Sequence, residues 1–316
     1  MHKIGIDLGG TNIAAGIVNE NGEILFKKSV PTGATRKKEE IIDDIARLCR
    51  SLSKEAGLTL DKVEAIGIAV PGGVDEKSGE ILFTPNIPFS GINICNILSE
   101  KLDGKKIALA NDANAATLAE VVCGAAKGAD NAVMITLGTG VGGGIVINKK
   151  IYSGSNGLAA EIGHFVISMG GEKCGCGRKG CFEAYASATA LIRMTKDELS
   201  KCFMSGEPTL MAESSKISAR TAFDAFKAGD KPAARVIEKY TTALANGISS
   251  LINIFQPDVF IIGGGVSGEK QFLIDLLQPK VDEEDFARTA KKRTRLCTAS
   301  CGNDAGIIGA AFAAEV

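Results

Sequence analysis

Three cysteines and one histidine lie close together near the middle of the chain. Cys174, Cys176 and Cys181 fall within eight residues, and His164 precedes the first of them by ten residues. One imidazole and three thiolates form a tetrahedral ligand set for Zn²⁺, and the intervening glycines would let a short loop fold round the ion. Because four protein ligands leave no open coordination position, we expect a structural zinc site. The alternative is a loop of metal-free thiols.

The other cysteines and the second histidine are separate from this cluster. The chain has nine cysteines, and the six outside the cluster are scattered mostly among apolar neighbours. We interpret these six as buried small hydrophobic residues, namely Cys49, Cys95, Cys123, Cys202, Cys297 and Cys301. The two histidines are His2 and His164, so a mechanism that needs a catalytic histidine has one candidate in practice.

Two glycine-containing turns could bind phosphate. Each joins two predicted strands, and the residues are Gly9, Gly10 and Thr11 in the first turn and Gly138, Thr139 and Gly140 in the second. Without a Cβ, the backbone N–H groups of such a turn can approach an anion closely. Neither turn continues as a P-loop or as the helix of a dinucleotide-binding motif, so plain hairpins are the alternative. Asp7 precedes the first turn and could hold Mg²⁺ through water.

An Asn–Asp pair stands at a predicted strand-to-helix junction. Asp112 follows Asn111 there, between a strand over residues 106–110 and a helix over residues 113–122. A carboxylate at such a junction either caps the helix or, within hydrogen-bond reach of a substrate hydroxyl, accepts a proton. The residues alone favour the cap, and the similar sequence Asn303-Asp304-Ala305 is interpreted as a cap as well.

The elements that must position these residues form a pattern that occurs twice. Apolar periodicity predicts, in the first half, strands over 3–8, 13–18, 23–30, 64–70 and 106–110 and helices over 37–56, 93–102 and 113–122. A loop rich in Pro and Gly extends from residue 71 to about residue 91. The second half has strands over 132–137, 145–148, 258–262 and 295–299 and helices near 183–199, 219–228, 232–255, 270–278 and 304–315. This repetition predicts two related α/β halves with a cleft between them.

Composition restricts the kind of protein. A chain of 316 residues is long enough for about two domains, and 45% hydrophobic residues allow a sizeable core. The charge is balanced, with 36 basic and 37 acidic residues, so nucleic acid is not an expected partner. No apolar run approaches the length of about 18–20 residues that spans a bilayer, and Asp7 interrupts any N-terminal signal sequence. We therefore expect a cytoplasmic protein that does not bind membranes.

Together, these motifs resemble those of the ROK family of sugar kinases and repressors. The family signature can be followed through Leu137, Gly140-Val141-Gly142, Gly144-Ile145, Gly154 and Ala160-Glu161-Ile162-Gly163-His164, and the cysteines match its zinc motif. Residues 6–11 match its first phosphate motif, and Gly263-Gly264-Gly265-Val266 matches its adenosine-side turn. The resemblance runs from residue 4 to the last predicted helix, and it is strongest to bacterial glucokinases.

The resemblance implies a fold and an assembly. The fold is α/β and of the actin-like ATPase (ribonuclease H-like) type, in which two domains close on sugar and ATP. We expect a smaller N-terminal domain over residues 1–116, completed by the C-terminal helix over residues 304–316, and a larger domain with the zinc loop over residues 117–303. We also expect a homodimer or a larger even homo-oligomer.

The resemblance also implies an activity, the ATP-dependent phosphorylation of a hexose, with glucose as the expected substrate and glucose 6-phosphate as the product. Asp112 would accept the proton of the attacking hydroxyl. The sugar-binding positions match Gly72, Gly73, Asn86, Asn111, Asp112, Glu161, His164 and Glu183, and the nucleotide-binding positions match Asp7, both glycine turns, Gly264 and Gly265. The implied cofactors are ATP, Mg²⁺ and structural Zn²⁺. With one imidazole nitrogen of His164 on zinc, the other could meet a sugar hydroxyl.

Several alternatives stay open. The chain could phosphorylate another hexose, such as N-acetylmannosamine, fructose or allose, because the same pocket residues would serve. It could also be a sugar-sensing ROK protein without catalysis. A repressor would need a DNA-binding module, for which a first strand at residue 3 leaves no room. Read alone, Asn86 could form a turn and Glu183 could cap a helix.

Overall fold

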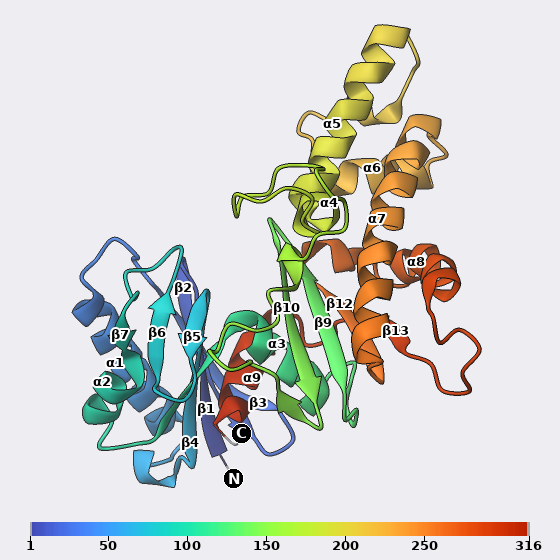
Figure 1. Cartoon of the computed structure of the whole chain (residues 1–316). Helices are drawn as coiled ribbons and strands as arrows, with labels where there is room; N and C mark the ends of the chain where they lie inside the picture. The colour runs from blue at the N-terminus through green and yellow to red at the C-terminus, as the bar shows by residue number, and fades with distance from the viewer. Residues whose placement is uncertain (1, 315–316) are drawn as a thin grey trace. The chain divides into compact units, whose positions relative to one another are not determined.

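The computed structural model describes residues 2–314, and the chain divides into two compact units (Figure 1). The first unit comprises Met1–Ala132, Gly144–Ala160 and Ser300–Val316, and the second comprises Val133–Gly143 and Glu161–Ala299. Strands and helices are mixed in both units, in agreement with the predicted α/β class. The predicted domain boundary between residues 116 and 117 falls inside a helix of the first unit.

The first unit is built on a sheet with the strand order β3-β2-β1-β4-β8. β1, β2 and β3 pair antiparallel, whereas β4 pairs parallel with β1 and β8 pairs parallel with β4. The bounds are β1 (His2–Leu8), β2 (Asn12–Asn19), β3 (Ile24–Pro31), β4 (Ala65–Val70) and β8 (Ile107–Asn111). Because β1, β4 and β8 are parallel, their carboxyl ends meet at one edge of the sheet, which is where α/β proteins bind ligands.

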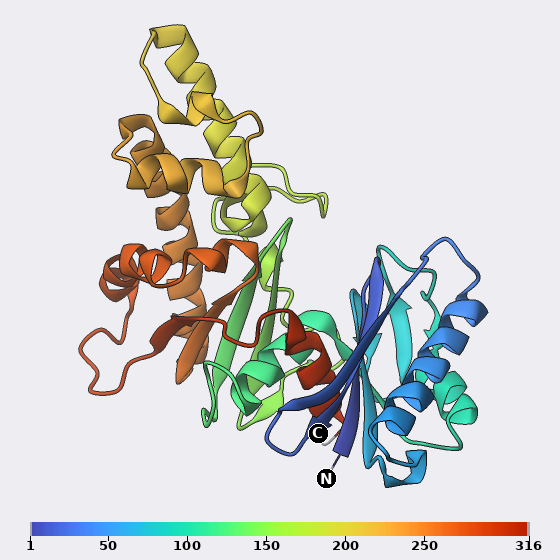
Figure 2. The ribbon, with the colours of Figure 1, turned by 180° about the vertical axis from the view of Figure 1, so that it is seen from behind.

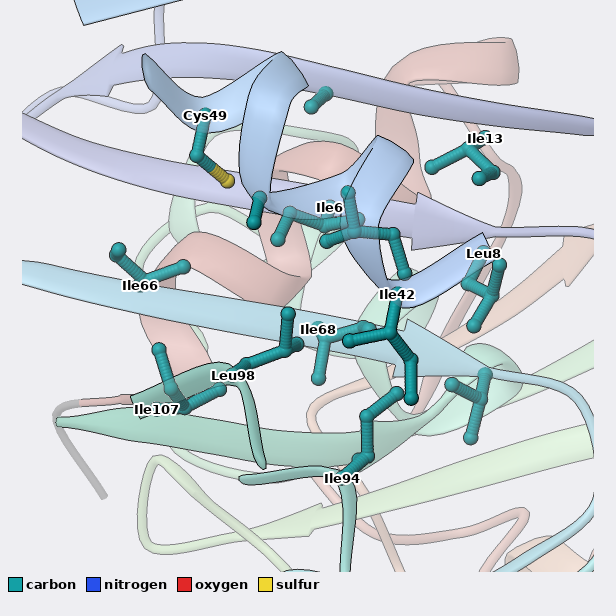
Figure 3. Close-up of a cluster of buried hydrophobic side chains, with 14 of the residues drawn as sticks. Ile6, Leu8, Ile13, Ile42, Cys49, Ile66, Ile68, Ile94, Leu98 and Ile107 are labelled. Carbon is teal, nitrogen blue, oxygen red and sulfur yellow. The ribbon is translucent and has the colours of Figure 1, made fainter. Parts of the chain in front are cut away.

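One face of this sheet carries the main hydrophobic core of the unit. Alternate residues of β1, such as Ile6 and Leu8, lie in this core with residues of α1 (Lys38–Glu55) and α2 (Ile94–Lys101) (Figure 3). Apolar residues recur along α1 at helical spacing, among them Ile42 and Cys49. Burial of this stripe is therefore what holds α1 on the sheet.

The other face is covered by α3 (Asp112–Val122) and α9 (Ala305–Ala313), which lie side by side (Figures 1 and 2). Glycines allow α9 to approach the strands backbone to backbone. A Cβ on Gly5 in β1 or on Gly67 in β4 would collide with carbonyl oxygens of α9, and one on Gly309 in α9 would collide with the backbone of α3. A side chain at any of these positions would force the helix away from its packing partner.

The predicted Pro- and Gly-rich loop contains a small antiparallel sheet. Its order is β5-β6-β7, with β5 (Gly73–Asp75), β6 (Glu80–Phe83) and β7 (Ile92–Asn93). Ile81 and Phe89 are fully buried and belong to the same core as α1. Strands of two to four residues show too little alternation to be recognised in a sequence, which is why this sheet was not predicted.

A second five-stranded sheet has the order β11-β10-β9-β12-β13. Its strands are β9 (Ala132–Leu137), β10 (Val141–Ile147), β11 (Lys150–Ile151), β12 (Val259–Gly263) and β13 (Arg295–Thr298). Of these strands, β11 and residues 144–147 of β10 belong to the first unit. The second unit contains η2 (Ile162–His164), α4 (Glu183–Ala186), α5 (Ala188–Ser205), η3 (Leu210–Glu213), α6 (Ala219–Lys227), α7 (Lys231–Phe255), η4 (Gly265–Glu269) and α8 (Gln271–Glu284). The helix predicted near 183–199 is two helices, because the Ser187 side chain accepts the Ala190 N–H at 3.0 Å and starts α5 anew.

Two further interpretations of the sequence are corrected by the structure. The strand predicted over 145–148 begins at Val141, so Gly143 and Gly144 lie within β10. A Cβ on Gly143 would lie 2.8 Å from the Met134 carbonyl oxygen, so close packing accounts for that glycine. Asp304 makes no side-chain cap of α9, and its carboxylate pairs with Lys27 instead.

Candidate active site and metal centre

Asn111 caps α3 at the carboxyl end of β8. Its Oδ1 accepts the backbone N–H groups of Ala113 and Asn114 at 2.9 and 3.1 Å, and its Nδ2 donates to the Gly72 carbonyl oxygen at 2.9 Å. The cap therefore also ties the loop after β4 to the start of α3. Asp112 is the first residue of the helix rather than its N-cap, so the main capping function belongs to its neighbour.

Asp7 lies near the carboxyl end of β1, and the negative charge of Asp112 acts on its carboxylate. The pKa of Asp7 is raised to about 6, mainly by burial and also by the Asp112 carboxylate, while Lys27 opposes the rise. A carboxylate whose charge is disfavoured by burial and by a neighbouring carboxylate is one that a divalent cation would stabilise. The chemistry of this pair therefore fits the predicted Mg²⁺.

The first glycine turn lies beside this pair. The Gly9 N–H donates to the Asn12 carbonyl oxygen at 3.0 Å, and the Thr32 hydroxyl donates to the Gly9 carbonyl oxygen at 2.6 Å. A Cβ on Gly10 would lie 3.3 Å from the Cβ of Asn86, so the predicted sugar-binding residue Asn86 stands against the turn. Thr32 was not singled out from the sequence, because a threonine at the end of a strand carries no distinguishing signal.

The second glycine turn is fixed by the start of α5. The Gly138 N–H donates to the Gly140 carbonyl oxygen at 3.0 Å and closes the turn between β9 and β10. The Gly138 carbonyl oxygen accepts the Ala188 N–H at 2.9 Å, and the Thr139 carbonyl oxygen accepts the Thr189 hydroxyl at 2.7 Å. These bonds occupy the Gly138 N–H and carbonyl oxygens of the turn, so an anion would have to be met by the other N–H groups of the turn.

The turn that follows β12 lies against the same region. A Cβ on Gly264 would lie 2.6 Å from the Leu137 N atom, directly before the second glycine turn. Nothing lies within 4 Å of a Cβ placed on Gly265. The predicted adenosine-side turn and the predicted phosphate turn are thus neighbours within the second unit.

His164, Cys174, Cys176 and Cys181 form a compact cluster whose ligand atoms all lie within 4.8 Å of one another. The Cys176 and Cys181 Sγ atoms are 3.7 Å apart, as are the Cys174 Sγ and the His164 Nδ1. Bonds of about 2.0–2.3 Å in a tetrahedron require edges of about 3.6–3.8 Å, and these two separations match such edges. Burial raises the pKa of Cys174 to about 12, and a cation would be needed to keep that thiolate charged. Because Nδ1 faces the cysteines, Nε2 of His164 is the nitrogen not directed at the cluster.

The loop that carries the cysteines is shaped by its own backbone. The Cys174 N–H donates to the Arg178 carbonyl oxygen at 2.9 Å, and the Gly180 N–H donates to the Glu172 carbonyl oxygen at 2.8 Å. The Arg178 guanidinium donates to the His164 carbonyl oxygen at 3.1 Å, which joins the loop to η2. Glu161 directly precedes η2, and its carbonyl oxygen accepts the His164 N–H at 3.0 Å.

Glu183 links the cluster of His164 and three cysteines to the second glycine turn. Its Oε2 accepts the Val141 N–H at 3.0 Å, and its Oε1 lies 3.3 Å from the Cys174 Sγ. Gly140 lies so close to the same carboxylate that any side chain there would displace it. Glu183 is the first residue of α4, and these contacts give it a role beyond that of a helix terminus.

The predicted site residues are thus divided between the two units. The first unit contains Asp7, Gly9, Gly10, Thr11, Gly72, Gly73, Asn86, Asn111 and Asp112, and the second contains Gly138, Thr139, Gly140, Glu161, His164, Cys174, Cys176, Cys181, Glu183, Gly264 and Gly265. Within the first unit, contacts join Asn111 to Gly72 and Gly10 to Asn86, and within the second, Glu183 joins the cluster of His164 and three cysteines to the second glycine turn.

Comparisons with known proteins agree on one family. Residues 3–315 match the ROK family. A glucokinase of Thermotoga maritima is 38% identical over 310 residues, which cover 98% of this chain and 95% of that protein. The ROK hexokinase of Thermus thermophilus is 34% identical with a TM-score of 0.83 and covers 100% of this chain and 98% of its own. A ROK family glucokinase of Streptomyces griseus, solved in complex with glucose and AMPPNP, is 35% identical with a TM-score of 0.77 and covers 100% and 99%.

Proposed function

The chain belongs to the ROK family, and we propose that it is a glucokinase, which transfers the γ-phosphoryl group of ATP to glucose and forms glucose 6-phosphate. The observation that carries this proposal is the match over the whole chain to a ROK glucokinase that binds glucose and an ATP analogue. The same match confirms the predicted actin-like α/β fold.

On the sugar side, Asp112 is the proposed general base. A carboxylate within hydrogen-bond reach of the 6-hydroxyl would accept its proton as that oxygen attacks phosphorus. The proposed sugar ligands are Gly72, Gly73, Asn86, Asn111, Glu161, His164 and Glu183. Amide and carboxylate groups suit a ring of hydroxyls because together they supply both donors and acceptors.

On the nucleotide side, the two glycine turns are the proposed phosphate ligands. Gly9, Gly10 and Thr11 would act with Gly138, Thr139 and Gly140, and Gly264 and Gly265 would line the adenosine end. Asp7 would hold Mg²⁺ through water, and this ion would neutralise charge on the phosphates. Catalysis would rest mainly on alignment and charge stabilisation, because phosphoryl transfer asks for little covalent chemistry from the protein.

The proposed metal ion in the Cys₃His cluster is a structural Zn²⁺. It would hold the loop over residues 164–183 in shape and orient His164 through Nδ1, so that Nε2 is available to a sugar hydroxyl. Within residues 2–314, none of the helices is both apolar and long enough to traverse a bilayer. A cytoplasmic location and a homodimer or larger even assembly stay predictions, as does the division into domains at residues 116–117 and 303–304.

The test is an ADP-release assay with ATP, Mg²⁺ and a panel of hexoses. We expect glucose to give the highest kcat/KM, above N-acetylmannosamine, fructose and allose. A higher kcat/KM for another sugar would keep the kinase and change its substrate. Glucose binding by calorimetry without ADP release from any sugar would identify a sensor and refute the proposed enzyme.

A further inference from the structure

α3 carries a buried carboxylate, Glu120, that the proposed reaction does not use. The residue has no exposed surface. Its Oε1 accepts the backbone N–H groups of Ser300 and Cys301, both at 2.8 Å. Its Oε2 accepts the Ala125 N–H at 2.7 Å and the Ser300 hydroxyl at 3.1 Å. A charge withdrawn from water is tolerated only when it is hydrogen-bonded in this way.

The bonds of Glu120 fasten the chain directly before α9. Ser300 is the first residue of the last segment of the first unit, which continues through η5 (Gly302–Asp304) into α9. The first two backbone N–H groups of this segment, those of Ser300 and Cys301, therefore both donate to the Glu120 carboxylate of α3. Loop backbone bound to a buried charge has little freedom to shift, because any movement would leave the charge without its donors.

The segment bonded to Glu120 continues into the first turn of α9, which lies against Asp7. A Cβ on Gly306, in the first turn of α9, would lie 2.7 Å from both Cγ and Oδ2 of Asp7, so the backbone of this turn rests on that carboxylate. Asp304 pairs with Lys27 at the same end of the helix. The sugar side is anchored separately, since Asn111 is fixed by its own bonds to the start of α3 and to Gly72.

We propose that Glu120 is a positioning residue for MgATP: by holding Ser300 and Cys301 it sets the first turn of α9 against Asp7. The inference rests on the proposed function and assigns a role to a residue outside the ligand set. Glu120 touches neither substrate nor nucleotide in this role. Its removal changes the nucleotide side of the reaction and leaves the sugar side as it is.

The test uses Glu120→Gln and Glu120→Ala in the full chain. Gln keeps one oxygen for the two N–H groups of Ser300 and Cys301 but presents an NH₂ to the Ala125 N–H, so its effect is the smaller one. We expect the KM for MgATP to rise by about threefold with Gln and by about tenfold or more with Ala. The Kd for glucose without nucleotide should stay within about twofold of wild type.

A second readout does not depend on activity. Hydrogen exchange followed by mass spectrometry should show much faster exchange of the Ser300 and Cys301 amides in the Ala variant, a smaller acceleration in the Gln variant, which keeps the oxygen they bond, and unchanged exchange in β12. Glu198→Gln is the matched control: Glu198 is a buried carboxylate of the second unit, bound to Arg235 at 2.6 Å and to Lys201 at 3.0 Å. It should leave the KM for MgATP unchanged.

The outcomes separate this inference from the proposed function. A wild-type protein without glucose-dependent ADP release refutes the function itself. With an active wild type, faster exchange at residues 300–301 together with an unchanged KM for MgATP overturns the positioning role. An equal loss of affinity for glucose and MgATP also overturns it, because that result describes general loosening. If the Ala variant does not fold, the Gln variant alone decides.

Discussion

The two groups of site residues are held in place by different means. In the first unit Asp7, Asn111 and Asp112 stand where buried strands end, and the core beneath them supports their backbone. In the second unit the residues from 161 to 182 have no helix or strand beyond η2 and isolated bridges. The first group is supported by apolar burial, whereas the second has backbone hydrogen bonds within its loop and, with the proposed zinc bound, would have the ion as well.

This difference teaches which changes each region tolerates. A substitution in the first group that replaces one side-chain oxygen by nitrogen, such as Asp to Asn, leaves the sheet, the helix cap and the core intact. The loop of the second group cannot lose a ligand without losing part of what shapes it. Substitutions in the first region should therefore separate chemistry from folding, and substitutions in the second should not.

The largest expected effect is that of Asp112→Asn. The amide cannot accept the proton of the attacking hydroxyl, so kcat should fall by about a thousandfold. Because Asn111 makes the cap, the melting temperature and the Kd for glucose should stay close to those of wild type. Steady-state kinetics and calorimetry on the same preparation measure both. Near-normal turnover would mean that another group takes the proton.

Asp7→Asn should make the protein more stable and less active. The pKa of Asp7 is about 6 in the fold, against an ordinary value of 3.8, so folding favours the protonated carboxyl. Above pH 6 the ionised carboxylate destabilises the fold by up to about 3 kcal/mol, and below about pH 4 both states are protonated and the difference vanishes.

The measurement for Asp7→Asn is urea unfolding without Mg²⁺. The gain in the free energy of unfolding over wild type should be present at pH 8 and should disappear by about pH 4. A gain of equal size at both values would trace the effect to packing instead of charge. Loss of MgATP turnover in the same variant would show that the destabilising charge is the one the reaction needs.

The smallest expected effect on ligand binding comes from Cys176→Ala in the second region. Cys176 is the exposed ligand of the cluster, and its loss should weaken zinc binding and lower the affinity for glucose by about tenfold. Hydrogen exchange should accelerate over residues 161–182 and stay unchanged in β1, β4 and β8. Cys202→Ala, which removes a buried thiol outside the cluster, is the control. Metal analysis that finds no zinc in the native protein would contradict this account.

Much of this organisation was predictable because its signals are local. Helical spacing in α1, glycine pairs after strands and three cysteines within eight residues are all visible in short windows of the chain. The cluster of His164 and three cysteines and the start of α3 were therefore found from the sequence. The predicted fold and function are confirmed by the ROK relatives, while the roles of individual site residues stay predictions.

The remaining features depend on residues that are distant in the chain. The residues next to Glu120 in the sequence do not indicate that its carboxylate accepts hydrogen bonds from the N–H groups of Ser300 and Cys301, about 180 residues further along the chain. Cys123, Cys297 and Cys301 were interpreted as buried small residues, yet all three are partly exposed, and the Sγ atoms of Cys123 and Cys301 lie 3.9 Å apart. Such pairs arise only when α3 and α9 pack together, and local periodicity carries no information on which helices will meet.

The division of the first unit into three chain segments has a consequence for biosynthesis. A ribosome produces β1, β4 and α3 early, but α9, which covers Gly5 and Gly67, is made after the whole second unit. Until then α3 alone covers that face of the nascent sheet and the part under α9 is uncovered, and exposed apolar surface on a growing chain promotes aggregation. We therefore expect the second unit to be translated in full before the first unit has its last helix. The unit whose first strands leave the ribosome earliest would then complete its folding last.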